Sequence, residues 1–167
     1  KRKRKGPKQT RNIHRVIIDP TNPNVVYAGA IGNPYGQSKN RGVYKTTDGG
    51  ETWNQILYTN DTSGVGDMIM DPKNPNKLLV AMWHHYRNPY HLESGGKGSG
   101  IYTSKDKGQT WAKSEAFLSG ENVGRIGISF ANDGVVYAVV DNQEKYEKEE
   151  TEEEDLTGEF FLKMDSF

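Results

Sequence analysis

Side chains that could hold a sugar or a peptide are concentrated in one short stretch of the chain, residues 83–93. The candidate ligand contacts in this stretch are Trp83, His84, His85, Tyr86, Arg87, Tyr90, His91 and Glu93. Aromatic rings pack on the apolar faces of sugars, while arginine and histidine donate directed hydrogen bonds. Residues 32–41 share an Asn-Pro-Tyr triplet with this stretch and add Tyr35 and Arg41 as candidates. The composition therefore predicts a binding surface.

A metal site or cofactor site is a weaker interpretation of the same residues. Imidazole is a common metal ligand, so a site formed by His84, His85 and His91 is conceivable. Neighbouring side chains in an extended chain point in opposite directions, which separates His84 from His85. The glycine-rich residues 95–100 lack the Gly-Lys-Ser/Thr ending of a phosphate-binding loop. We therefore expect no metal and no cofactor.

Three charged residues, Arg15, Asp67 and Arg125, stand at corresponding places at the start of three similar apolar runs. If these runs line a central channel, the three side chains lie at its mouth, where they either solvate the channel, pair with one another or contact a ligand. Glycoside hydrolysis would need two carboxylates roughly 5 to 10 Å apart. Asp67 is the candidate catalytic residue, with Glu93 or Asp61 as possible partners, or an acid outside this chain.

The apolar runs belong to a repeat. The segment Arg-Val-Ile-Ile-Asp-Pro-Thr-Asn-Pro-Asn at residues 15–24 recurs as Asp-Met-Ile-Met-Asp-Pro-Lys-Asn-Pro-Asn at residues 67–76, and a degenerate third copy begins at Arg125. A period of about fifty residues is typical of solenoids, arrays and propellers.

An eight-residue pattern, Ser/Thr-x-Asp-x-Gly-x-Thr-Trp, also occurs twice, at residues 46–53 and 104–111. We call these segments the box turns. The residues that define them are Thr46, Asp48, Gly50, Thr52, Trp53, Ser104, Asp106, Gly108, Thr110 and Trp111. The aspartate is suited to accept hydrogen bonds from the turn's own N–H groups, and the tryptophan to pack between sheets. We therefore predict a structural role for the box turns rather than a catalytic one.

Each unit is expected to form four antiparallel strands, because short β-branched and aromatic runs alternate with Gly, Pro, Asn and Asp. In the first unit the strands are predicted at about residues 13–19, 25–31, 42–46 and from 52 onward. In the second they are predicted at about residues 68–71, 77–83, 100–104 and 110–113. Four antiparallel strands repeated radially describe the blade of an all-β propeller.

In such a meander, the Asp-Pro-x-Asn-Pro-Asn turns and the box turns share one end of the strands. The long connections, residues 32–41, 58–66, 84–99 and 114–124, share the other end, which we call the long-loop face. Binding sites are commonly formed by long loops on a rigid scaffold.

The predicted organisation is a basic leader or the end of a preceding blade at 1–12, blade one at 13–64, blade two at 65–122 and the start of blade three at 123–143. Residues 144–167 are expected to be a charged linker with a short amphipathic helix at residues 156–164. Propellers usually need at least four blades to close, so an incomplete ring is expected.

The composition argues against several kinds of covalent link, metal site and partner. The chain has 167 residues, a hydrophobic fraction of 33% and no cysteine, which excludes disulfides and thiolate metal sites. Its first residues are basic, but no aromatic is interleaved with them to stack on bases, so no nucleic-acid partner is expected. No apolar run is long enough to span a bilayer, so no membrane insertion is expected.

At the box turns and the Asp-Pro-x-Asn-Pro-Asn turns, the sequence resembles the Asp-box, or bacterial neuraminidase repeat, propellers, and in particular their sortilin-type branch. The resemblance covers about residues 10–141 and is carried by residues 42–53, 66–72, 80–83 and 95–102. It implies a large propeller, glycosyl hydrolase-like in bacteria and a ligand-sorting receptor in eukaryotes. It also implies an extracytoplasmic location and box turns that lie away from the active site. The sialidase signature Phe/Tyr-Arg-Ile-Pro does not occur in this chain.

These observations leave three hypotheses open. The first is a noncatalytic, secreted binding module for a glycan or a peptide, whose further partners are the remaining blades of a parent propeller. The alternative is a fragment of a glycoside hydrolase, xyloglucanase-like or sialidase-like, that uses a carboxylate at the channel mouth. The third is a purely structural segment. Whether the protein is an enzyme stays undecided from the sequence.

Overall fold

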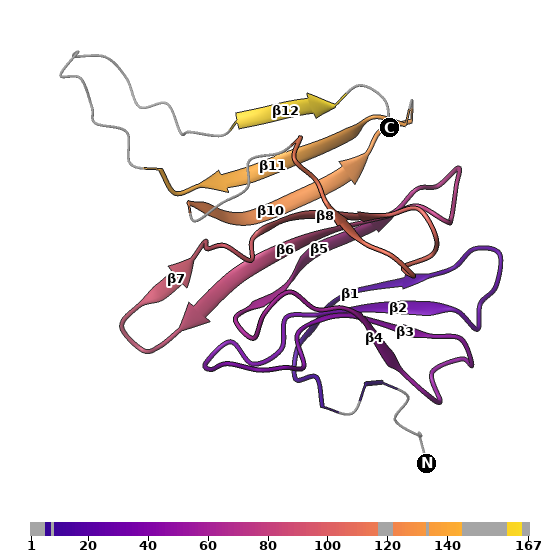
Figure 1. The fold of residues 1–167 in the computed structure, drawn as a ribbon, viewed down its shortest axis with the longest axis horizontal. Coiled ribbons are helices and arrows are strands. Elements are labelled where there is room, and N and C mark those ends of the chain that lie inside the picture. Colours follow the sequence, from indigo (N-terminus) through magenta and orange to yellow (C-terminus); the bar gives the residue numbers. More distant parts are fainter. Residues whose placement is uncertain (1–5, 8, 117–121, 133, 145–159, 165–167) are drawn as a thin grey trace.

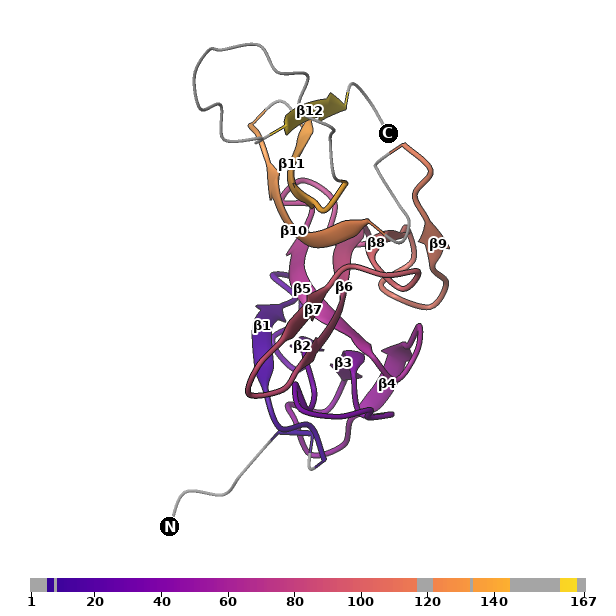
Figure 2. The same cartoon turned by 90° about the vertical axis from the view of Figure 1, so that its left-hand side faces the viewer.

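The computed structural model describes residues 6–7, 9–116, 122–132, 134–144 and 160–164. Within these residues the fold is all-β, with three antiparallel sheets and no helix. The sheets follow one another along the chain, and Figure 2 shows them stacked from the N-terminal sheet to the C-terminal one.

The first sheet is a meander of neighbouring strands in the order β1–β2–β3–β4. Its strands are β1 (Ile13–Ile18), β2 (Val26–Ala30), β3 (Gly42–Thr46) and β4 (Asn54–Leu57). The second sheet has the order β5–β6–β8–β9, and β7 pairs with β6 off this path. Its strands are β5 (Ser63–Met70), β6 (Leu78–Arg87), β7 (Leu92–Ser94), β8 (Gly100–Ser104) and β9 (Ala112–Lys113). The third sheet contains β10 (Val123–Phe130), β11 (Val136–Asn142) and β12 (Phe160–Met164).

The proline-rich turns form because their aspartates bond the local backbone. Asp19 N–H donates to the Val25 carbonyl at 3.0 Å, and Asp19 Oδ1 accepts from Thr21 N at 2.8 Å. Asp71 repeats this arrangement in the second sheet, where its N–H donates to the Lys77 carbonyl at 3.1 Å. The predicted turns are therefore confirmed in the first two sheets.

Two apolar clusters hold the sheets together. The cluster between the first and second sheets includes Tyr27, Val43, Met68, Val80 and Met82. The cluster between the second and third sheets includes Leu79, Ile101, Ile126, Val136 and Val140. The second sheet is thus covered on both faces.

Each of the two terminal sheets has one face on which described apolar side chains are exposed. Val16 and Ile18 on β1 are 57% and 59% exposed, whereas Met68, at the position of Val16 in the second sheet, is 1% exposed. On the third sheet, Tyr137 and Val139 are 40% and 41% exposed. This is the pattern expected where further sheets of the same kind would pack.

The first strands of the three sheets, β1, β5 and β10, lie beside one another, and β4 and β9 lie on the far side of the molecule (Figure 2). Each first strand contains a β-bulge: between Ile13 and Arg15, between Val65 and Asp67, and between Val123 and Ile126. Bulges redirect side chains and are common beside functional sites.

The strand register corrects the predicted alignment of Arg125. Arg15 pairs with Gly29 and Asp67 with Ala81, but the corresponding residue of β10 is Gly127, which pairs with Val139. The turn after β10 closes from Ala131 to Val135, two residues shorter than the turn from Asp19 to Val25. Arg125 therefore lies two residues further from its turn than Arg15 and Asp67 do.

Two other expectations about local structure were wrong. The predicted helix at residues 156–164 is a strand where the structure describes it, because β12 pairs antiparallel with β11; residues 156–159 lie outside the described residues. The predicted loop at residues 84–99 is partly a hairpin, since β6 continues to Arg87 and pairs with β7. Figure 1 shows this hairpin projecting beyond the sheets.

Candidate functional site

Asp67 connects the first strands of all three sheets. Its Oδ1 accepts from Arg15 Nε at 3.0 Å and from Met68 N at 2.8 Å, while Oδ2 accepts from Ile128 N at 3.1 Å. The Asp67 side chain is 13% exposed and that of Arg15 49% exposed. Both oxygens of this candidate catalytic carboxylate are therefore occupied by contacts within the protein.

Arg125 lies over an aromatic surface. Its Cζ is 5.7 Å from the centre of the Trp83 ring, and that ring stacks on His85 with centroids 4.4 Å apart. Arg125 Nη2 is 3.0 Å from His14 Nε2. Burial lowers the pKa of His14 and the charge of Arg125 lowers it further, so His14 is neutral and accepts this bond. Within the described residues, no carboxylate forms an ion pair with Arg125.

Asp67 and Arg125 line an open groove of about 430 Å³ between β5, β10 and β11. Its other lining residues include Gly66, Gly127 and Asp141. A Cβ at Gly66 would lie 3.2 Å from Trp83 Cβ, so glycine allows β5 to pass close to the base of the Trp83 side chain. The groove presents a guanidinium, carboxylates and backbone to a ligand.

A polar network at one end of the groove was not predicted from the sequence. Trp83 Nε1 donates to Ser94 Oγ at 3.0 Å, and Ser94 Oγ donates to Asp141 Oδ2 at 3.3 Å. Asp141 Oδ1 in turn accepts from Gln143 Nε2 at 2.6 Å. The sequence offered one signal, the polar Asp-Asn pair directly after an apolar strand, but these residues were predicted as part of the third blade with no role in binding.

The β6–β7 hairpin carries the exposed part of the predicted binding stretch. Tyr90 at its tip is 97% exposed. The turn is fixed by Asn88 Oδ1, which accepts from the N–H groups of Tyr90 and His91. Tyr35 is also exposed, at 67%. Its loop is tied to the hairpin by the Arg87 N–H, which donates to the Pro34 carbonyl at 2.9 Å.

His84 and Glu93 face each other across the same hairpin. His84 Nε2 is 3.2 Å from Glu93 Oε1, and His84 Nδ1 is 3.0 Å from Thr62 Oγ1. Glu93 remains 53% exposed, while Tyr86 is half-buried and Arg87 and His91 are exposed. The hairpin thus combines charged and aromatic side chains near the long-loop face.

Arg41 and His85 lie beneath this surface. Arg41 is fully buried, and its Nη2 donates to the carbonyls of Asn33 and Gly36. Its Nη1 lies 3.3 Å from Nδ1 of His85, which is 3% exposed. Burial, and then the charge of Arg41, lower the pKa of His85 to about 4, so the imidazole is neutral and accepts from Arg41. The pair supports the 32–41 loop from below and has no surface of its own for a ligand.

The first box turn is built around Asp48. Its Oδ1 accepts from the N–H groups of Glu51 and Thr52 at 2.9 Å and from Thr46 Oγ1 at 2.7 Å. Gly49 and Gly50 have positive φ values of 69° and 92°, which glycine adopts without steric strain. Hydrogen bonds, first from Thr52, hold the pKa of Asp48 well below its usual range.

The second box turn repeats this geometry around Asp106. Hydrogen bonds, first from Thr110, lower the pKa of Asp106 to about 2. The two box turns lie beside the proline-rich turns, since Gly49 N–H donates to the Asn24 carbonyl and Lys107 N–H to the Asn76 carbonyl. They are therefore at the opposite end of the strands from the long loops.

No group of three His, Asp or Glu side chains that could hold a metal ion occurs among the described residues. No helix in this part of the chain is long and apolar enough to cross a bilayer.

Comparisons with known proteins agree with this geometry. The family model Sortilin-Vps10, described as sortilin, neurotensin receptor 3, matches residues 2–166. The fold is similar to that of the GH74 xyloglucanase from Xanthomonas campestris, with a TM-score of 0.56 and 16% identity over 90% of this chain and 20% of that one. It is also similar to an ancestral GH74 enzyme, with a TM-score of 0.57 and 17% identity over 81% of this chain and 18% of that one.

A comparison with curated protein sequences finds no match. This chain spans 20% and 18% of the length of the two similar structures. At these identities the structural similarity shows the fold alone, a set of propeller blades.

Proposed function

Because this chain belongs to the Sortilin-Vps10 family, we propose that it is a segment of a β-propeller whose long-loop face binds a glycan or a peptide. The three sheets are then successive blades at residues 13–64, 65–122 and from 123 onward. Further blades of a parent propeller would pack on the exposed faces of β1 and β11. The family also favours an extracytoplasmic location.

The observation that carries the proposal is the environment of Arg125. Its guanidinium lies 5.7 Å from the Trp83 ring, at the edge of a groove, with a neutral histidine as its hydrogen-bond partner. An arginine in this setting retains donors for ligand oxygens or a ligand carboxylate. The exposed rings of Tyr35 and Tyr90 supply apolar contact area near the same end of the sheets.

Hydrolysis by Asp67 is less well supported than binding. A glycosidase needs one carboxyl group as acid and a second as base or nucleophile. Asp67 instead bonds Arg15 and two backbone amides, and Glu93 contacts His84 at 3.2 Å. Similarity to a GH74 xyloglucanase is a similarity of fold, so it does not assign that activity to this chain.

We expect the chain to bind glycans or peptides on arrays, and two substitutions to weaken this binding. Tyr90→Ser removes an exposed aromatic ring and Arg125→Gln removes the guanidinium. Each is expected to raise the Kd about tenfold, equivalent to about 1.4 kcal/mol. The matched controls are Tyr137→Ser on β11 and Arg11→Gln near the N-terminus, and neither should change the Kd.

Two results would contradict this proposal. One is binding that the control substitutions weaken as much as the two test substitutions do. The other is release of new reducing ends from a polysaccharide by wild type but not by Asp67→Asn, which would indicate a hydrolase.

A further inference from the structure

One type of turn occurs in all three sheets, at the place where the chain leaves the second strand. Asn33 follows β2, Asn88 follows β6 and Asn142 ends β11. The side-chain oxygen of each asparagine accepts from the N–H two residues later, at 3.3, 2.9 and 3.0 Å. The residues held in this way are Tyr35, Tyr90 and Glu144. All three are exposed, so two neighbouring sheets present a tyrosine at the same place in the repeat.

The turn that presents Tyr35 is held from beneath by Arg41. This buried guanidinium donates to the carbonyls of Asn33 and Gly36, which lie on either side of the tyrosine in the sequence. The turn is therefore ordered before a ligand arrives, which reduces the entropy that binding costs.

The turn that presents Tyr90 is closed by backbone bonds and is tied to the first turn. The N–H of Asn88 donates to the His91 carbonyl at 2.9 Å. The N–H of Arg87 donates at 2.9 Å to the carbonyl of Pro34, the residue before the other tyrosine. The two exposed rings thus belong to neighbouring, ordered turns of adjacent sheets.

The surroundings of Tyr90 favour a glycan over a peptide as the ligand. The ring is 97% exposed, and exposed charged or polar side chains close to it in the sequence are Arg87, His91 and Glu93. The centres of protein interfaces are depleted in charged residues. A sugar instead places an apolar face on an aromatic ring and directs its hydroxyls to charged and polar groups.

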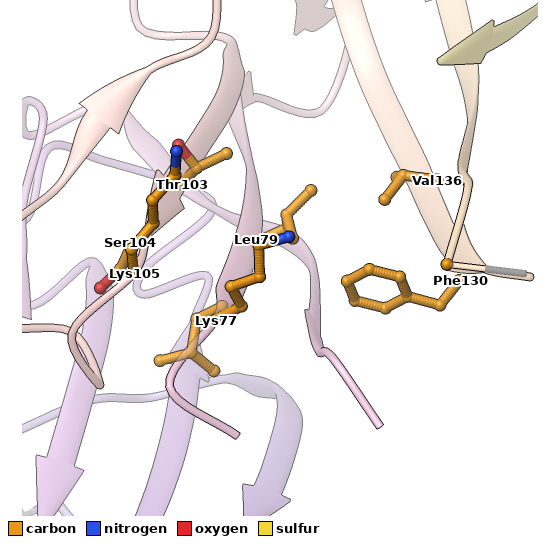
Figure 3. A pocket seen from close by; sticks show the side chains of 9 residues that line it. Lys77, Leu79, Thr103, Ser104, Lys105, Phe130 and Val136 are labelled. Carbon is orange, nitrogen blue, oxygen red and sulfur yellow. The ribbon is translucent and has the colours of Figure 1, made fainter. Parts of the chain in front are cut away.

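The position of the two rings outside the cavities points the same way. Neither tyrosine lines the groove of about 430 Å³, or the hollow between Leu79 and Phe130 that Figure 3 shows. That hollow holds about 20 Å³, enough for about one water molecule. The anchor residues of peptides and proteins are typically buried in pockets. The two rings are therefore suited to a ligand that lies flat on the surface.

We propose that Tyr35 and Tyr90 form a platform on which rings of a glycan chain stack, with Glu93 accepting from its hydroxyls. The proposal rests on the proposed function and names the ligand class of the long-loop face. The glycan crosses the first and second sheets. In the third sheet the equivalent turn carries the carboxylate of Glu144 in place of a ring.

Isothermal titration calorimetry of the full chain with cellohexaose, mannohexaose and hexagalacturonate tests the proposal. We expect at least one of these probes to bind, and Tyr35→Ala and Tyr90→Ala each to raise its Kd about tenfold. Tyr35→Phe and Tyr90→Phe keep the ring and should bind as wild type does. The matched control is Tyr137→Ala, at an exposed tyrosine on β11, which should leave the Kd unchanged.

Three results would overturn the proposal. Retention of peptides on the arrays, with no binding of the three hexasaccharides, would keep the binding face but make its ligand a peptide. Binding of a hexasaccharide that Arg125→Gln weakens and the tyrosine substitutions do not would place the glycan in the groove. No binding of either class of ligand would contradict the proposed function as well.

Discussion

Replacing Gly64 by alanine is expected to lower the free energy of unfolding by about 3 kcal/mol, at the upper end of the usual cost of overpacking. Gly64 is on β5, where that strand crosses the end of β2. A Cβ at this position would lie 2.5 Å from the Ile31 carbonyl oxygen and 2.7 Å from Ile31 Cα. These are backbone atoms of the residue directly after β2 and cannot rotate away, so β5 and the end of β2 must separate.

Chemical denaturation followed by tryptophan fluorescence measures this loss. The matched control is Gly127→Ala on β10, since a Cβ there meets nothing within 4 Å. It should change the free energy of unfolding by no more than about 0.5 kcal/mol. Equal stability of the two variants would mean that the first and second sheets do not approach as closely as described.

The second large effect is expected from Lys107→Met, which should lower the free energy of unfolding by about 3 kcal/mol at pH 7. The reason is that this substitution leaves a buried carboxylate without its cation. The side chain of Asp19 is 0% exposed and lies 2.9 Å from Lys107 Nζ. Lys107 holds this contact in spite of a left-handed φ of 60°, where glycine is favoured. The equivalent residue of the first box turn is Gly49, with a φ of 69°.

The loss of unfolding free energy caused by Lys107→Met should depend on pH. Burial raises the pKa of Asp19, but hydrogen bonds from Lys107 and Thr21 outweigh it and lower the pKa from 3.8 to about 2. The stability contributed by this lowered pKa is therefore present above about pH 4 and is lost as the pH falls through about 2. The difference between wild type and Lys107→Met should shrink over that range.

Denaturation at several pH values tests this prediction. Lys107→Gly separates the two effects, because it removes the same charge but relieves the left-handed backbone, and it should cost less than Lys107→Met. Lys105→Met, an exposed lysine two residues away, is the control. A pH-independent difference between wild type and Lys107→Met would show that the contact with Asp19 does not stabilise the fold.

The strands and turns were largely predictable because their signals are local. Gly49 and Gly50 mark a turn that needs positive φ, and the aspartate of each box turn has its partners within four residues. What the sequence did not reveal depends on contacts between distant segments. The run at residues 160–164 is too short for its period to separate helix from strand, and pairing with β11 decides it.

Many residues of the candidate site were predicted, but their exposure and their long-range partners were not. Residue type identified Arg41 and His85 as possible ligand contacts, yet both are buried, since the 32–41 loop packs over them. Conversely, His14 and Asp141 were not predicted, because only the packing of the third sheet brings them to Arg125 and Ser94. Exposure and long-range contacts arise only when the sheets pack together, so the sequence alone did not predict them.

The most direct test of the proposed binding face is hydrogen exchange of the chain with and without the glycan or peptide that the arrays retain. The account predicts slower exchange in residues 32–41 and 83–94 when the ligand is bound, with the box turns at residues 46–53 and 104–111 unchanged. Slower exchange in the box turns, with the long loops unchanged, would contradict it.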